Sequence, residues 1–266
     1  MHPLLAATLV TAATWDAWRW YFARVAATPE EALSLATTVI FLAALGVARA
    51  RKPAAPRPVA LLPAAILLGV YASSYPFLPA IMRAALAIAA TLFAFHLALF
   101  RERPPIAFWG LVALALPVLP SLQFVLGYPM RVISAMLAVG LLQAQGLAVA
   151  RQGTFLLWRG EMVDFDAPCS GVNMLWAGLL LTLMGCVLFR LGAVKVATAI
   201  ALSVVLSIAS NALRASSLFY VEAGLVPQAP AWWHEGIGIA AFTLSAVVTL
   251  WFLTRLRGRE VMPCVA

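Results

Sequence analysis

The chain has 266 residues, of which 64% are hydrophobic and only 11% are charged, and its formal net charge is +8. A soluble domain carries about 25% charged residues, so the composition excludes an ordinary soluble domain. The positive charge does not indicate nucleic-acid binding, because the basic residues form short clusters between long apolar runs, as in the loops of membrane proteins. We therefore predict an all-α fold, a polytopic helical bundle surrounded by membrane lipids, with a single integral membrane domain over residues 1–266.

Long apolar runs predict about eight transmembrane helices, since a helix needs about 20 mostly apolar residues to cross a bilayer. The N-terminal run lacks the Lys or Arg that opens a signal peptide, so we interpret it as a retained span or a helix on the membrane surface. It is the weakest of the eight, because Asp16, Arg19 and Arg24 lie within it. The predicted spans are 4–24, 32–48, 59–74, 81–100, 106–120, 170–190, 193–213 and 236–254.

Loop charges predict the orientation of these spans. If the spans alternate, the loops or tails at 49–58, 101–105, 190–195 and 255–266 share one side of the membrane. Lys and Arg stay on the cytoplasmic side, so we predict an inner (cytoplasmic) membrane protein with both termini in the cytoplasm. The acidic residues of this side are Glu102 and Glu260, and its basic residues are Arg49, Arg51, Lys52, Arg57, Arg101, Arg103, Arg190, Lys195, Arg255, Arg257 and Arg259.

A long segment outside the predicted spans runs from about residue 121 to 168. Within it, residues 130–148 could form a ninth span, but that would place Arg190 and Lys195 outside, against the positive-inside rule. We therefore expect a helix that lies in the outer interface or dips into the bilayer and returns. The following sequence, TFLLWRGEMVDFD, predicts a small hairpin that turns at Arg159-Gly160. Lipid cannot satisfy open strand edges, so the hairpin should lie above the bilayer.

Three chemically matched residues reach the outer face in this topology. Cys169 opens the sixth span in the first turn of its helix, Arg214 lies where the seventh span ends, and His234 lies where the eighth begins. Each residue also has a simpler interpretation: a small buried hydrophobe, a snorkelling anchor and an interfacial polar residue, respectively. Their shared membrane depth favours a common function.

The same three residue types suit acyl transfer. A thiolate is the nucleophile, and a helix N-terminus or a nearby cation lowers the pKa of a thiol. His234 can take the thiol proton and return it to a leaving amine. Arg214 can stabilise the oxyanion that forms when a thiolate attacks a carbonyl. We therefore predict Cys169, Arg214 and His234 as catalytic residues that act on a peptide bond at the outer membrane surface.

Other polar residues carry weaker signals. Glu161, Asp164 and Asp166 could bind a cation, but solvated loop charges are the better explanation, so we predict no metal site and no cofactor. Cys186 lies within an apolar helix and Cys264 in the cytoplasmic tail, and we expect neither to react.

Three short motifs resemble the signature regions of the exosortase/archaeosortase family. They are APCSG (167–171), NALR (211–214) and HEGIG (234–238), and residues 128–146 are similar to the segment before that family's cysteine. The resemblance covers about 128–254, the expected catalytic part of the chain. It implies a membrane-embedded cysteine peptidase and transpeptidase, a hydrolase of the exosortase type.

This resemblance also implies partners and residue roles. The partners are exported proteins with a C-terminal tail of short motif, transmembrane helix and basic cluster, as in PEP-CTERM protein sorting, a system often linked to exopolysaccharide. Cys169 is the implied nucleophile, Arg214 the transition-state stabiliser and His234 the proton-transfer residue. Val172-Asn173-Met174 follows the CSG where many members have Leu-Arg, so the subfamily and the recognised tail motif stay open.

Two other functions fit parts of the sequence. A transporter or permease would use His96, Arg83 and Asp16 as polar sites within the membrane, which explains the spans but not three motifs at one depth. A non-catalytic membrane assembly protein could keep the fold and would tolerate loss of Cys169. The acceptor of the cleaved chain, whether water, an amine or a lipid, stays open in the enzyme interpretation.

Overall fold

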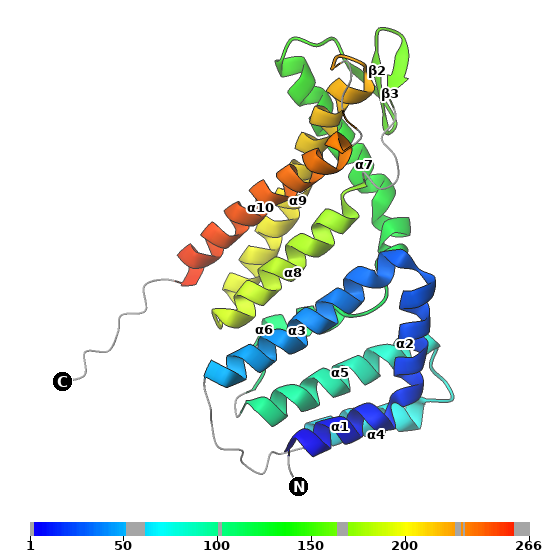
Figure 1. The fold of residues 1–266 in the computed structure, drawn as a ribbon, viewed down its shortest axis with the longest axis vertical. Helices are drawn as coiled ribbons and strands as arrows, with labels where there is room; N and C mark the ends of the chain where they lie inside the picture. Colours follow the sequence, from blue (N-terminus) through cyan, green and yellow to red (C-terminus); the bar gives the residue numbers. More distant parts are fainter. Residues whose placement is uncertain are drawn as a thin grey trace, which may run out of the picture. The chain divides into compact units, whose positions relative to one another are not determined.

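The computed structural model consists of helices and a small sheet, and the chain divides into two compact units, Met1–Leu119 and Pro120–Ala266 (Figure 1). The parts of the chain that the structure describes are residues 3–51, 62–100, 103–163, 170–226, 230 and 232–257. Five helices within these parts are long and apolar enough to cross a membrane. The helical membrane fold predicted from composition is thus confirmed, whereas the number of eight spans and the single domain stay predictions.

The first unit is built of helices joined by short connections. Its elements are α1 (Pro3–Ala13), α2 (Trp15–Ala27), η1 (Pro29–Glu31), α3 (Ala32–Arg51), α4 (Leu62–Ser74), α5 (Ala80–Leu99) and α6 (Ile106–Leu114). Small side chains, including Ala7 of α1 and Ala90 of α5, allow these two helices to approach closely. Phe108 of α6 packs edge-on against Phe41 of α3, with ring centroids 5.1 Å apart. The core of this unit is therefore formed by small and aromatic side chains between helices.

The predicted span 4–24 is wrong, because a turn at Thr14 divides it into α1 and α2. Figure 1 shows α2 running crosswise to α1 and α5. This arrangement gives the charged residues partners: the Tyr75 hydroxyl donates a hydrogen bond of 2.7 Å to Asp16, and Arg83 Nη1 lies 3.7 Å from the same carboxylate. A continuous span would instead expose Asp16 to lipid, which is costly.

The polar residues of the transporter alternative do not come together. Asp16 contacts Arg83 in the first turn of α5, whereas His96 lies thirteen residues further along that helix. At 1.5 Å per residue, this separates Arg83 from His96 by about 20 Å. The His96 ring instead packs between Phe100 and Phe108, with centroid distances of 5.1 and 5.2 Å. These three residues therefore do not form one intramembrane site.

The predicted span 106–120 is also wrong, since α6 ends at Leu114. Pro117 explains the end of α6, because proline has no N–H and clashes within a helix. The next helix, α7 (Leu119–Ala144), is continuous and begins eleven residues before the helix predicted over 130–148. By length and composition α7 can cross a membrane, which differs from the interfacial helix expected there.

The second unit combines α7 with a small sheet and three packed helices. Its further elements are β1 (Ala150–Gln152), β2 (Phe155–Trp158), β3 (Glu161–Val163), α8 (Val172–Leu188), α9 (Ala193–Glu222) and α10 (Trp233–Arg257). α8, α9 and α10 pack against one another. Gly178 allows α8 to approach Ser203 and Ser207 of α9, a packing of small residues that is typical of membrane helices. Lys195 donates a hydrogen bond of 2.7 Å to the carbonyl of Leu256, which joins the start of α9 to the end of α10.

The predicted hairpin at Arg159-Gly160 is confirmed. β2 and β3 are antiparallel, with Trp158 opposite Glu161. Arg159 and Gly160 both have positive φ, 52° and 85°, as a two-residue hairpin turn requires. A third strand, β1, pairs with the other edge of β2. The sequence does not predict β1, because its residues, Ala-Arg-Gln, show no alternation of apolar and polar side chains. All three residues are exposed, so none is required in the core.

α9 is longer than the predicted span 193–213. It continues to Glu222, so Arg214 lies inside the helix and not at its end. At 1.5 Å per residue α9 is about 45 Å long, which exceeds the roughly 30 Å of a bilayer's hydrocarbon core. The additional residues include Leu218 and Phe219, which pack against the sheet. Contacts with the sheet therefore explain why the helix extends beyond its predicted end.

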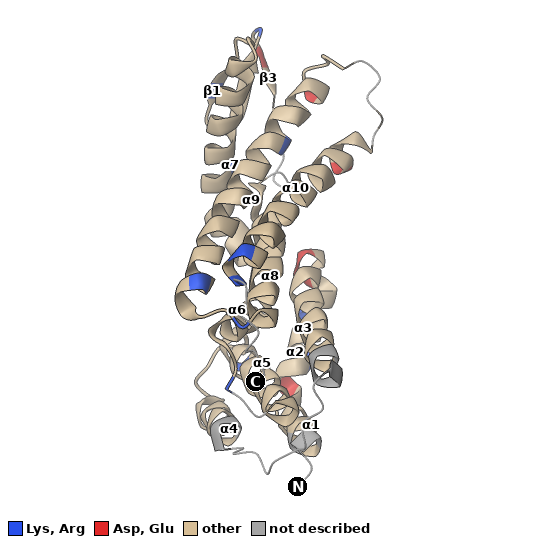
Figure 2. Cartoon of the chain, turned by 90° about the vertical axis from the view of Figure 1, so that its left-hand side faces the viewer, with Lys and Arg blue, Asp and Glu red and all other residues tan. Residues whose placement is uncertain are grey.

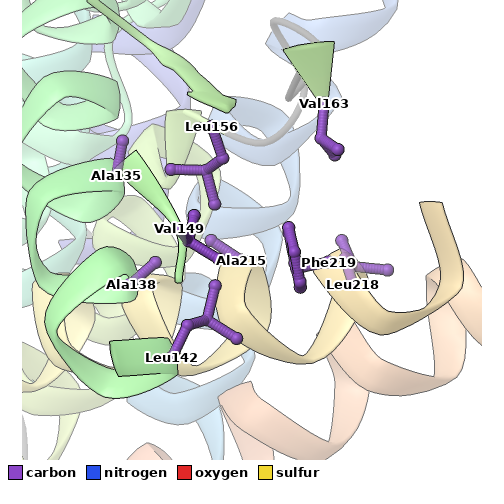
Figure 3. Close-up of a cluster of buried hydrophobic side chains, with 9 residues drawn as sticks. All are labelled: Ala135, Ala138, Leu142, Val149, Leu156, Val163, Ala215, Leu218 and Phe219. Atoms are coloured by element: carbon purple, nitrogen blue, oxygen red, sulfur yellow. The ribbon is translucent and has the colours of Figure 1, made fainter. Parts of the chain in front are cut away.

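An apolar cluster holds the sheet against α7 and α9 (Figure 3). Trp158 adds an edge-on ring contact with Phe219, at a centroid distance of 5.8 Å. The buried residues of the cluster are Ala135, Ala138, Leu142, Val149, Leu156, Val163, Ala215, Leu218 and Phe219. The sheet is thus a packed part of the second unit and shares its core.

We expect Leu156→Ala to lower the free energy of unfolding by about 2–5 kcal/mol, because removing a buried leucine leaves a cavity. Leu156 is fully buried between the sheet and the two helices. Met162→Ala on the neighbouring strand is the control, since Met162 is 61% exposed. Thermal unfolding of the detergent-solubilised protein measures both effects. Equal shifts for the two variants would contradict the described core.

Candidate active site

The segment that carries the predicted nucleophile leads into α8. Cys169 lies outside the described residues, which resume at Ser170. α8 begins at Val172 with Gly171 as its N-cap, and the predicted place of Cys169 in a first helical turn falls outside the described residues. Cys169 precedes the helix by three residues. The first N–H groups of α8, which have no partner within the helix, still favour negative charge before its start.

Ser170 links this segment to α7. Its buried hydroxyl donates a hydrogen bond of 2.8 Å to Oε1 of Gln123. The Oγ of Ser170 in turn accepts a hydrogen bond of 3.4 Å from the N–H of Val172, at the start of α8. Ser170, the residue next to Cys169, is thereby held against α7, and its hydroxyl also satisfies the first N–H of α8.

Gly171 packs directly against α9. Its φ is +82°, and a Cβ at this position would lie 2.7 Å from Cγ of Asn211. Only glycine fits both this conformation and this contact. Asn211 is itself buried, and its Nδ2 donates a hydrogen bond of 2.9 Å to Oγ of Ser134 on α7. α7, α9 and the segment before α8 therefore meet around Asn211.

We expect Gly171→Ala to lower the free energy of unfolding by roughly 1–3 kcal/mol, the cost of an unfavourable backbone conformation, with the clash against Asn211 added to it. Gly140→Ala is the matched control, because Gly140 lies inside α7 and a Cβ there would meet nothing within 4 Å. Chemical unfolding in detergent measures both. If Gly171→Ala were as stable as Gly140→Ala, the close approach to Asn211 would be refuted.

Arg214 lies three residues after Asn211, on the same face of α9. Gly238 of α10 packs against its side chain, since a Cβ at Gly238 would lie 3.1 Å from Nε of Arg214. The Nε of Arg214 is buried and has no hydrogen-bond partner among the described residues. This guanidinium can therefore donate to an anion or oxyanion that enters the site.

His234 lies in the first turn of α10, as predicted for the start of the eighth span. It precedes Gly238 by four residues, so both lie on the face of α10 that meets Arg214. The Ser210 hydroxyl donates a hydrogen bond of 2.6 Å to the carbonyl of Ala241, which fixes α10 against α9. The structure thus brings His234 and Arg214 to one end of the unit, where the segment after Cys169 also packs.

A comparison with known families decides the identity of the chain. Residues 26–251 match the family model described as transmembrane exosortase (Exosortase_EpsH). The chain belongs to the transmembrane exosortase family. This match extends the resemblance over 128–254 into the N-terminal half. No curated protein and no solved structure matches the chain.

Four polar residues around the candidate site of this exosortase are not predicted as site residues from the sequence. Ser170 and Asn211 stand inside the APCSG and NALR motifs, beside the residues with obvious chemistry. Gln123 and Ser134 are eleven residues apart, which is three helical turns, so they lie on one face of α7. Two polar residues on one face of an otherwise apolar helix were the sequence feature that could have indicated them.

The weaker candidates of the exosortase lie apart from this site or outside the described residues. Glu161 is exposed on β3, and Asp164 and Asp166 are not described. The part of the chain that the structure describes holds no group of three His, Cys, Asp or Glu that could bind a metal ion. Cys186 is fully buried in α8, and Cys264 lies outside the described residues.

Proposed function

We propose that this exosortase is a cysteine protease and transpeptidase that removes C-terminal sorting tails, of the PEP-CTERM kind, from exported proteins. One observation carries the proposal: three motifs distant in the sequence pack together at one end of the second unit. Gly171, next but one to Cys169, contacts Asn211, and Gly238, one turn from His234, contacts Arg214. The transporter alternative would instead use Asp16, Arg83 and His96, which do not come together.

The first half of the reaction forms a thioester. His234 takes the proton of the Cys169 thiol, and the sulfur attacks the scissile carbonyl carbon. As the C–S bond forms, the carbonyl π electrons move to oxygen, and the Arg214 guanidinium stabilises the resulting oxyanion. The C–N bond then breaks, and His234 gives its proton to the departing amine of the tail.

The second half transfers the acyl group. An acceptor with an O–H or N–H group attacks the thioester, and His234 accepts its proton. A second oxyanion forms at the same carbonyl oxygen, again beside Arg214. The C–S bond breaks, and the sulfur leaves as the thiolate, which can start a new cycle or take the proton back from His234. Water as acceptor gives proteolysis, whereas an amine or a lipid gives transpeptidation.

The charges of the second unit support an extracytoplasmic site (Figure 2). Arg190, Lys195, Arg255 and Arg257 lie where α8 ends, α9 begins and α10 ends, and the Arg257 guanidinium lies 5.4 Å from the ring centroid of Phe189. The described acidic residues of this unit lie at the opposite end: Glu161 on β3, Glu222 at the C-terminal end of α9 and Glu235 at the N-terminal end of α10. At the helix ends and beyond them, this basic end carries four Lys or Arg, whereas the sheet at the other end carries Arg151 and Arg159, so the bias of positive residues supports an outward-facing end with Arg214 in our proposal.

We expect a membrane-impermeant maleimide to label Arg159→Cys in intact spheroplasts and to label Lys195→Cys only after permeabilisation. Both variants are made in a background without native cysteines, and both positions are exposed. Arg159 lies in the hairpin turn next to the site, whereas Lys195 lies at the basic end of α9. The reverse labelling pattern would place the site in the cytoplasm and contradict the proposed localisation.

The proposed reaction is tested by co-expression with a tailed protein encoded near this chain, one that ends in a short motif, a single span and a basic cluster. Mass spectrometry of that protein then locates any cleavage site. We expect cleavage before the span only when the exosortase is present. An unprocessed tail in cells that contain the correctly inserted exosortase would contradict the proposed function.

A further inference from the structure

The N-terminal part of α7 lies against the segment that follows Cys169. The Oε1 of Gln123 accepts a hydrogen bond of 2.8 Å from the Ser170 hydroxyl. One helical turn later on α7, a Cβ at Gly127 would lie 3.4 Å from this Oε1 and 3.9 Å from Cβ of Ser170. Gln123, Gly127 and Ser170 therefore pack together at one point of contact between α7 and this segment.

Gln123 also contacts the first turn of α8. Its Nε2 donates a hydrogen bond of 3.5 Å to Oδ1 of Asn173, which is the longer and weaker of its two bonds. Ser170 and Asn173 flank the turn at which the chain enters α8, and Gly171 in this turn has a φ of +82°. One carboxamide thus contacts both sides of the turn, so it restrains the main chain directly after Cys169.

The face of α7 that carries Gln123 also holds α9. Ser134 lies eleven residues after Gln123, three helical turns along the same face, and accepts a hydrogen bond of 2.9 Å from Asn211. Arg214 lies three residues after Asn211. The polar side chains of α7 therefore contact both the residue next to Cys169 and the helix that carries Arg214.

The position of a nucleophile affects the chemical step directly. The attacking atom must approach the carbonyl carbon to about 3–3.5 Å in the right direction, and an error of about 1 Å can cost roughly 100-fold in rate. Cys169 is joined to Ser170 by one peptide bond, so a displacement of Ser170 also displaces Cys169. Ser170 is buried, and its hydroxyl uses Gln123 as its acceptor. Loss of that acceptor carries the cost of a buried hydroxyl without its bond, which favours a shift of the segment.

We propose that Gln123 is a positioning residue that acts through Ser170 and holds the Cys169 thiolate in line with the scissile carbonyl. This inference rests on the proposed function, because it takes Cys169 as the nucleophile. In this role Gln123 contacts neither the substrate nor the reacting atoms, and it fixes the segment that carries the thiol. Removal of its hydrogen bond should therefore slow thioester formation and leave the affinity for the substrate tail unchanged.

Single-turnover cleavage with enzyme in excess tests this role, with the co-encoded tailed protein as the probe and Gln123→Met as the variant. Methionine is similar in length and replaces the carboxamide by a thioether. The limiting rate constant at saturating enzyme does not change with the folded fraction of the variant. We expect this rate constant to fall about 10- to 100-fold, whereas the concentration of folded enzyme that gives half the limiting rate should change about twofold or less.

Two further single variants provide a control and a test of reach. Gln152→Met is the matched control, because Gln152 is exposed on β1 of the same unit, and it should cleave at the wild-type rate. An equal loss in Gln152→Met would overturn the assignment to Gln123.

Gln123→Asn keeps the carboxamide but is about 1.5 Å shorter, so it withdraws the oxygen from Ser170. It should lose rate as Gln123→Met does, and it replaces Gln123→Met if that variant fails to insert into the membrane. A wild-type limiting rate for Gln123→Asn would contradict the proposed contact.

A double-mutant cycle tests whether Gln123 acts through Ser170. The cycle consists of Gln123→Met, Ser170→Ala and the double variant. Once Ser170→Ala has removed the hydroxyl, we expect Gln123→Met to change the limiting rate by about twofold or less, since the bond that couples the two residues is already absent. Two rate losses that multiply in the double variant would show independent actions and overturn the inference.

The remaining outcomes distinguish this inference from the proposed function. If Gln123→Met cleaves at the wild-type limiting rate, the positioning role is refuted and the proposed function stands. If it instead weakens tail binding at an unchanged limiting rate, Gln123 is a binding residue, and the inference is again refuted. If wild type cleaves no tail, the proposed function fails, and this inference fails with it.

Discussion

Cys169→Ser is expected to insert into the membrane like wild type and to reduce tail cleavage by at least about 1,000-fold, as loss of a protease nucleophile does. A serine hydroxyl is not ionised near neutral pH, and the site was not arranged to activate it. The fold should be preserved, because serine and cysteine have nearly the same shape, and Ser170 and Asn211 keep their hydrogen bonds to α7. Quantitative immunoblots of membrane fractions and of the processed protein measure both quantities.

Cys186→Ser is the matched control for this substitution. Cys186 is fully buried in α8, away from the end of the helix that begins near Cys169. We expect its processing rate to stay near that of wild type. If Cys186→Ser lost activity while Cys169→Ser kept it, the nucleophile would be wrongly assigned.

Arg214→Lys is expected to reduce kcat by about 100- to 1,000-fold, the usual cost of removing an oxyanion donor. Gly238 brings the backbone of α10 against the Arg214 side chain, and the Nε of Arg214 is buried without a hydrogen-bond partner among the described residues. A lysine keeps the charge but replaces a planar set of donors with one flexible ammonium. Single-turnover cleavage of a tailed substrate by the purified variant gives the rate of the chemical step.

Arg159→Lys provides the comparison for Arg214→Lys. Arg159 is exposed in the hairpin turn, where its guanidinium lies 4.4 Å from the ring centroid of Trp158, so the same substitution should leave kcat unchanged. Near-wild-type cleavage by Arg214→Lys would show that charge alone is sufficient, which would exclude a directed hydrogen bond from the guanidinium to the oxyanion.

The membrane fold was predictable because hydropathy has a direct physical cause. Lipid excludes charged groups, so apolar runs long enough to cross the bilayer identify the helices. The boundaries of α3, α5 and α8 accordingly lie within a few residues of the predicted spans. The hairpin was predictable for a local reason, since a two-residue turn at Arg159-Gly160 joins two short apolar strands.

Predictions failed where tertiary contacts or prolines override hydropathy. Hydropathy does not register the partners that Asp16 finds in Tyr75 and Arg83, so the turn after α1 was missed. α9 continues past Arg214 because Leu218 and Phe219 pack on a sheet whose β1 strand has no sequence signal. These contacts join residues far apart in the chain, and a single sequence does not encode them as a local pattern.

The reactive residues of the candidate site could be proposed from the sequence, but the residues that pack around them and hold the helices together could not. Cys, Arg and His have side chains whose reactivity is evident from their type, so their membrane depth was enough to select them. Ser134 and Asn211 act through packing and hydrogen bonds between α7 and α9, which depend on how the helices meet.

A covalent intermediate on Cys169 is the most direct test of thiol catalysis. Purified exosortase is mixed with the tailed substrate, stopped in acid within one turnover, digested, and analysed by mass spectrometry. We predict that the peptide containing Cys169 carries the new C-terminus of the cleaved substrate as a thioester, which neutral hydroxylamine removes and which Cys169→Ser does not form. Rapid cleavage by Cys169→Ser, with no adduct on Cys169 in wild type at any time, would contradict the mechanism.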